Sequence, residues 1–185
     1  LLGGTYCSLG DLDSAIQPTY ECLQFYTSVH NLEEQAGAHI NLGNIYYDLG
    51  RWQEAREQYE AAVQITSEIG NSFEQALAHN NLGEVLRNQG NSIEAIEEYT
   101  KALMGWQNSP FQSALVLMNI GASSIQQGDL DAAEKYLDQS DKLFNEVGND
   151  SFASELLRYK AELALASGHY SEALSICIQS IQIAE

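Results

Sequence analysis

The segment NLGNIYYDLGRWQEA, residues 41–55, decides the fold because its key residues return at a fixed spacing. Its Asn-Leu-Gly opening reappears 40 residues later at residues 81–83, and again, as Asn-Ile-Gly, 38 residues further on at residues 119–121. A second glycine follows the first by seven residues, and an alanine follows it by twelve. These positions are Gly43, Gly50 and Ala55, then Gly83, Gly90 and Ala95, then Gly121, Gly128 and Ala133. Such self-similarity predicts a repeat protein.

The same template extends to both ends of the chain. Upstream it reaches Gly3, Gly10 and Ala15, and downstream it reaches Ala161, Gly168 and Ala173. Four residues after the alanine come Thr19, Tyr59, Tyr99, Leu137 and Cys177, and small residues follow three positions later. We therefore predict repeats at 1–30 (truncated), 31–70, 71–108, 109–148 and 149–185, together forming a single domain over 1–185.

Capping signals predict two helices in each repeat. The second glycine of the template suits the left-handed backbone conformation that ends a helix. Residues suited to cap a helix start precede Glu or Gln by three positions in the pairs Asn31/Glu34, Ser72/Gln75 and Ser109/Gln112. Gly70 and Gly148 are expected to end second helices. The predicted pairs are 32–49 with 51–69, 73–89 with 91–107, 110–127 with 129–147, and 151–167 with 169–185.

This pattern resembles the tetratricopeptide repeat, whose first helix carries Leu-Gly and an aromatic residue and whose second carries alanine, tyrosine and alanine. The residues that carry the resemblance are Leu42, Gly43, Tyr46, Ala55, Tyr59 and Ala62. The next repeat keeps the pattern except that Leu86 replaces the aromatic residue. The common repeat has about 34 residues, so these longer units are more similar to those of Pins/LGN-type scaffolds, kinesin light chain and MalT-like regulators. The resemblance implies an all-α fold, an α-solenoid of antiparallel helix pairs in a right-handed superhelix.

Charge and composition narrow the classes of partner. The net charge is −18, with 26 acidic and 8 basic residues. This disfavours nucleic acid and anionic membrane surfaces, which need clusters of Lys and Arg. It favours a basic partner, which the acidic surface would attract. Three cysteines without a Cys-x-x-Cys pair indicate a reducing compartment, so we expect a cytoplasmic protein.

No pattern of residues indicates catalysis, a metal site or a cofactor, so the sequence predicts that the protein is not an enzyme. His39 and His79 occupy equivalent repeat positions, but Leu117 and Leu157 replace them in the next repeats. We interpret both histidines as packing residues. Cys7 is interpreted as a small apolar filler, and Trp52 and Trp106 as packing or ordinary surface residues.

The resemblance places the binding surface in a concave groove lined by the first helices. Residues around the first glycine of each repeat are then expected to contact a partner: Ile40, Asn44, Tyr47, Asp48, Asn80, Glu84, Arg87, Asn88, Met118, Ala122, Gln126, Arg158 and Glu162, with Ile125 and Leu165 beside them. Asparagine both donates and accepts hydrogen bonds, so it suits a peptide backbone. Ile40 and Asn80 stand where relatives that bind terminal carboxylates carry lysine, which argues against such a ligand.

Three functions remain open from the sequence. The leading hypothesis is a scaffold whose concave groove binds a peptide or helix of a partner protein. The second is a regulatory or sensor domain excerpted from a larger signalling or transcription protein. The third is a structural module that self-associates through uncapped end helices.

Overall fold

The computed structural model describes residues 12–184, and within them every regular element is an α-helix. The chain divides into two compact units between Gln89 and Gly90, and each unit is described by itself. The predictions for Gly3, Cys7 and Gly10 lie outside the described residues. The predicted repeat boundaries and the single domain stay predictions.

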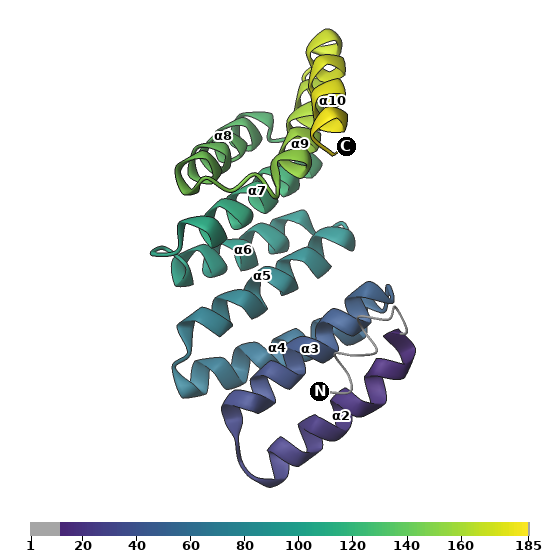
Figure 1. The fold of residues 1–185 in the computed structure, drawn as a ribbon, viewed down its shortest axis with the longest axis vertical. Coiled ribbons are helices and arrows are strands. Elements are labelled where there is room, and N and C mark those ends of the chain that lie inside the picture. The colour runs from purple at the N-terminus through teal and green to yellow at the C-terminus, as the bar shows by residue number, and fades with distance from the viewer. Residues whose placement is uncertain (1–11, 185) are drawn as a thin grey trace. The chain divides into compact units, whose positions relative to one another are not determined.

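The first unit holds four described helices, drawn in purple to blue in Figure 1. They are α2 (Leu12–Ser28), α3 (Leu32–Asp48), α4 (Trp52–Ile69) and α5 (Ser72–Asn88). Short turns join them, so successive helices run antiparallel and pack as neighbours. The core of this unit is made of small clusters, one around Leu23, Ala38 and Leu42 and one around Ile40, Ala62 and Ala78.

The second unit holds five helices, drawn in teal to yellow in Figure 1. They are α6 (Ser92–Gly105), α7 (Pro110–Gln127), α8 (Leu130–Val147), α9 (Ala153–Ala166) and α10 (Tyr170–Ala184). The all-α fold of antiparallel helix pairs is thus confirmed. Helix ends across both units lie within two residues of the predicted ones. The largest differences are at Gly105, where α6 ends two residues before predicted position 107, and at Ala153, where α9 begins two residues after predicted position 151.

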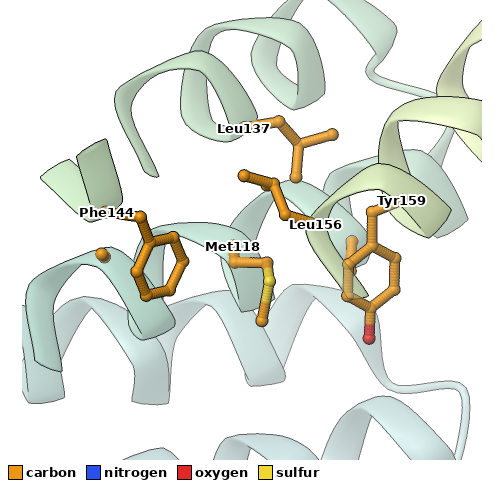
Figure 2. Close-up of a cluster of buried hydrophobic side chains, with 7 residues drawn as sticks. Met118, Leu137, Phe144, Leu156 and Tyr159 are labelled. Carbon is orange, nitrogen blue, oxygen red and sulfur yellow. The ribbon is translucent and has the colours of Figure 1, made fainter. Parts of the chain in front are cut away.

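An apolar core of the second unit is shown in Figure 2. Met118 from α7, Leu137 and Phe144 from α8, and Leu156 and Tyr159 from α9 are all buried there. The Phe144 and Phe152 rings are stacked, with centroids 6.0 Å apart. A buried hydrogen bond of 2.8 Å from Ser140 Oγ to the Ala114 carbonyl ties α8 to α7. The small residues of the template thus let helices approach closely enough for such contacts.

The predicted helix starts are confirmed in part. Asn31 caps α3, because its side chain accepts a hydrogen bond from the Glu34 amide. The Ser72/Gln75 prediction is wrong: Asn71 is the capping residue, and it accepts from the Glu74 amide. Ser109 does precede α7, with Pro110 as first residue, but its side chain makes no capping bond. At the start of α5, Asn71 stands one position before Ser72 and takes the capping role, for which asparagine and serine are both suited.

The predicted glycine helix ends are confirmed, and they reveal one exception. Gly50, Gly70, Gly128 and their counterparts Gly90, Gly148 and Gly168 all have positive φ angles. His30 occupies the same kind of position, with a φ of 55°. The hydrogen bond from Asn31 N to Tyr26 O closes the turn there, as Arg51 N to Tyr46 O does at Gly50. His30 therefore pays the steric cost of a left-handed backbone that glycine avoids.

We predict that His30→Gly stabilises the protein by about 0.5 to 1 kcal/mol, because the relieved steric cost exceeds the added flexibility of the unfolded chain. Urea unfolding followed by circular dichroism measures the change. Ser28→Gly, in the last turn of α2, serves as control and is expected to destabilise. A His30→Gly protein less stable than wild type would contradict this account of the turn.

The first glycine of the template lies where two helices of a pair touch. A Cβ atom at position 43 would lie 2.7 Å from Tyr59 Cδ1 and 2.8 Å from Tyr59 Cζ. Tyr59 is fully buried, so its ring has little room to move. Gly121 repeats the arrangement in the second unit, where a Cβ would lie 2.7 Å from Leu137 Cγ. In both units the glycine therefore contacts the residue sixteen positions after it in the sequence. This contact joins α3 to α4 in the first unit and α7 to α8 in the second.

We predict that Gly43→Ala destabilises the protein by about 1 to 3 kcal/mol, because the added methyl group collides with the buried Tyr59 ring. Gly37→Ala is a control in the same helix, since a Cβ there meets nothing within 4 Å. This second change is expected to stabilise by about 0.5 to 1 kcal/mol through helix propensity. Thermal or urea unfolding distinguishes them, and equal effects of the two changes would refute the contact.

Candidate functional site

A linked group of polar side chains lies on the first helices of the first unit, centred on Asn44. The buried Tyr59 donates its hydroxyl hydrogen to Asn44 Oδ1 at 2.7 Å. Asn81 Nδ2 on α5 donates to the same oxygen at 3.1 Å. Asn44 itself is exposed. Its oxygen is therefore held from two neighbouring helices, while its amide nitrogen keeps two donor hydrogens for which the described residues show no acceptor.

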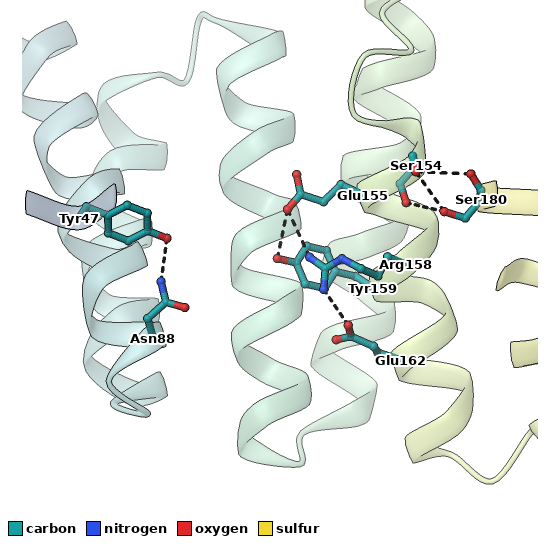
Figure 3. Close-up of polar contacts among 8 residues, drawn as sticks. All are labelled: Tyr47, Asn88, Ser154, Glu155, Arg158, Tyr159, Glu162 and Ser180. Atoms are coloured by element: carbon teal, nitrogen blue, oxygen red, sulfur yellow. Dashed lines mark hydrogen bonds and ion pairs between the residues drawn. The ribbon is translucent and has the colours of Figure 1, made fainter. Parts of the chain in front are cut away.

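A second bond joins the same two helices, about one turn further along α3 and two turns further along α5. Asn88 Nδ2 donates to Tyr47 Oη at 2.7 Å, as Figure 3 shows. Asp48 and Asn88 are exposed, and Tyr47 is partly buried. Between the two bonds Glu84 is partly buried and accepts a hydrogen bond from Asn80 Nδ2 at 3.4 Å. We call the group of Asn44, Tyr47, Asp48, Asn81, Glu84 and Asn88 the α3–α5 polar row.

The α3–α5 polar row is negatively charged. Burial raises the pKa of the Tyr59 hydroxyl above its usual value, and the nearby carboxylates of Glu84 and Asp48 raise it further. Tyr59 therefore stays protonated and keeps donating to Asn44. Of the two carboxylates, Asp48 is exposed and can attract basic groups, whereas Glu84 is partly buried on α5, as is Arg87.

The predicted residues of the second unit are arranged differently. Arg158 on α9 is exposed, but it already pairs with Glu162 at 2.7 Å and Glu155 at 3.4 Å, as drawn in Figure 3. Its guanidinium also lies 4.0 Å from the centroid of the Tyr159 ring. A ligand carboxylate would have to displace these partners. Gln126 is exposed, and its Oε1 accepts from Ser92 Oγ at 2.9 Å.

The structure shows that four of the predicted groove residues are buried. Ile40, Met118 and Ala122 are 6%, 2% and 3% exposed and belong to the apolar cores. Their side chains face neighbouring helices, so they support the fold and are inaccessible to a partner. Asn80 is also buried, at 9% exposure. The register predicted their positions on the helices correctly, but it could not tell how much of each position the adjacent helix covers.

The sequence reasoning missed Asn81 as a site residue. In the sequence Asn81 marks the repeat, and in the structure it also supplies the donor that links α5 to Asn44. The recurrence of asparagine at positions 41, 81 and 119 was the available signal. Asn41 is exposed, whereas Asn81 is partly buried beside Asn44.

The interpretation of His39 as a packing residue agrees with its contact, since Nδ1 lies 2.9 Å from Gln58 Oε1 at a partly buried position. Trp106 is buried and Trp52 is partly exposed, in keeping with packing and surface positions. Among the described residues, no group of three or more His, Cys, Asp or Glu side chains has an arrangement suited to a metal ion. No helix within residues 12–184 combines the length and apolar character needed to cross a membrane.

Comparison with known families matches two stretches of the chain, residues 34–108 and residues 114–146, each to a tetratricopeptide repeat family model. Together they cover more than half of the chain. The chain belongs to the tetratricopeptide repeat family. A search of curated proteins finds no significant match for the chain as a whole.

Solved structures of other tetratricopeptide repeat proteins resemble this one. BtubC (BKLC) from P. vanneervenii is 20% identical with a TM-score of 0.85, over 99% of this chain and 77% of that one. A Rap protein complexed with Competence and Sporulation Factor is 16% identical with a TM-score of 0.80, over 94% and 49%. YrrB, described as having an unusual peptide-binding site, is 18% identical with a TM-score of 0.64, over 98% and 82%. At these identities the likeness shows the fold alone.

We predict that Asn44 and Tyr59 are energetically coupled. Asn44→Ala and Tyr59→Phe should each destabilise by about 1 kcal/mol, because each breaks the same hydrogen bond. The double variant should lose about 0.5 to 1.5 kcal/mol less than the sum of the single changes. Unfolding in urea of the four proteins measures this coupling. Additive losses would show that the bond contributes nothing to stability.

Proposed function

We propose that this chain is a protein-interaction module whose α3–α5 polar row binds an extended segment of a partner protein. The observation that carries the proposal is the arrangement around Asn44. Two donors fix its oxygen, and its exposed amide nitrogen is left to donate to a ligand. A donor held in place before binding loses little side-chain entropy when a peptide carbonyl arrives.

The rest of the row supports the same kind of ligand. Asn88 is exposed and bonded to Tyr47, which lies one helical turn after Asn44 on α3, so the row contains a second amide group. A peptide backbone presents carbonyl and amide groups at regular intervals and can engage both. Asp48 adds an exposed negative charge, which favours a segment that carries Lys or Arg. The net charge of −18 acts in the same direction over a longer range.

The similar structures support a peptide ligand by analogy. One of them, YrrB, carries a peptide-binding site, and a Rap protein was solved with a bound factor. These proteins share only the fold with this chain, so the analogy adds weight to the class of ligand and none to its identity. A binding module in a reducing cytoplasm is the setting that we propose.

We predict that the double variant Asp48→Ala, Asn88→Ala loses partners that wild type captures. Wild type, this variant and a control are each used as bait in lysate of the source organism, and bound proteins are identified by mass spectrometry. A binary titration with the captured protein should then show a loss of affinity of roughly tenfold or more, which corresponds to two hydrogen bonds or ion pairs.

The control is Glu57→Ala, Gln64→Ala, two exposed residues of α4 that lie outside the α3–α5 polar row. It removes the same numbers of carboxylate and carboxamide groups as the test variant. Both variants must keep the unfolding midpoint of wild type within a few degrees. Equal binding by test and control variants would contradict the proposal and direct attention to another surface.

A further inference from the structure

A cavity of about 470 Å³ lies in the second unit between α8, α9 and α10. That volume falls within the range of pockets that hold ligands or anchoring side chains, roughly 300 to 1,000 Å³. None of its residues belongs to the α3–α5 polar row. It therefore carries an inference that stands or fails separately from the proposed function.

Partly buried apolar side chains form one part of the wall. Leu130 comes from the start of α8, Leu163 from α9 and Ile176 from α10, and the fully buried Leu137 closes the inner side. Each of the first three keeps some surface open to the cavity. Covering that surface with an apolar group of a ligand would be favourable in proportion to the area removed from water.

Carboxylates form the other part of the wall. Asp131 and Glu134 are exposed on α8, Asp138 lies further along α8, and Glu172 lines the cavity from α10. The one lysine of the lining, Lys160, is already engaged, with its Nζ on Asp141 and 3.5 Å from Asp138. His169, the remaining nitrogen base, lies 3.7 Å from Glu172.

The balance of charge in the cavity is therefore negative on the side of Asp131 and Glu134. Among the described residues no basic side chain forms an ion pair with either of them. An anionic ligand would meet these carboxylates and find the Lys160 ammonium already neutralised. A cation would gain their attraction, and it would gain more inside a partly enclosed cavity than on an open surface.

We propose that this α8–α10 cavity binds a basic and apolar peptide segment, in which an aliphatic side chain covers Leu130, Leu163 and Ile176 while a neighbouring Lys or Arg reaches Asp131 and Glu134. Apolar and acidic side chains both line this one hollow, so a short segment that carries leucine and lysine can satisfy both. This would give the chain a second recognition site, outside the first-helix surface on which the proposed function depends.

The test uses the full chain labelled with nitrogen-15 and three blocked tetrapeptides. The first alternates leucine with lysine, the second alternates leucine with glutamate, and the third alternates alanine with lysine. Binding is followed by amide chemical shifts in nuclear magnetic resonance spectra. We expect the leucine–lysine peptide to shift amides of Leu163, Ala164 and Glu172, and to bind at least roughly tenfold more tightly than either of the others.

Charge-neutralising variants complete the test. Asp131→Asn, Glu134→Gln should weaken the leucine–lysine peptide roughly tenfold, because each lost carboxylate removes a charge-assisted contact. Glu146→Gln, Asp150→Asn makes the same change of charge at exposed positions of the same unit that do not line the cavity, and should leave binding unchanged.

Three results would overturn the inference. Equal weakening in both variants would mean that the peptide responds only to the overall charge. Equal binding of the alanine–lysine peptide would mean that the apolar wall is not used. Shifts confined to amides away from α8, α9 and α10 would place the peptide elsewhere. None of these outcomes bears on the α3–α5 polar row, whose variants are different.

Discussion

The contact on which the first unit depends is the approach of Gly43 to the ring of Tyr59. Only a residue without a side chain lets α3 come this close to α4, because a methyl group would overlap the ring. The contact buries Tyr59 completely and brings its hydroxyl to Asn44. Packing and recognition are therefore connected: the feature that closes the helix pair also fixes the side chain that we propose for binding. Gly121 and Leu137 keep the packing part of this arrangement in the second unit, without the hydroxyl.

In the second unit Leu137 takes the place of Tyr59 and has no hydroxyl, and the residues around it differ as well. Ala122 replaces Asn44 at the equivalent position and is buried. Arg158 and Glu162 are exposed but pair with each other. The repeats thus share a framework and differ in what they present. In the second unit we propose the α8–α10 cavity as the binding surface, because carboxylates and partly buried apolar side chains both line it.

The fold could be predicted from the sequence because its determinants are local and periodic. The glycines that have positive φ angles predicted where the helices end. The repeated spacing between Gly43 and Tyr59 corresponds to a contact between two helices. The candidate site was predicted less well, for a physical reason. Register says which side of a helix a residue occupies, but exposure depends on the neighbouring helix, so Ile40, Met118 and Ala122 proved to be core. Asn81 and the α8–α10 cavity depend on contacts between repeats, which no single repeat motif encodes. The left-handed backbone of His30 could not be predicted, because the template has glycine at helix ends and this chain has histidine there.

The central claim is that packing fixes Asn44 in the free protein and so prepares the α3–α5 polar row for a ligand. The most direct measurement is the χ1 state of Asn44 in the unbound chain, from three-bond scalar couplings in nuclear magnetic resonance. Asp48, which is exposed on the same helix, provides an internal reference for a freely rotating side chain. The account predicts couplings of a single rotamer for Asn44, together with averaged couplings for Asp48. Averaged couplings for both residues would show that Tyr59 and Asn81 do not hold Asn44, and would contradict the claim.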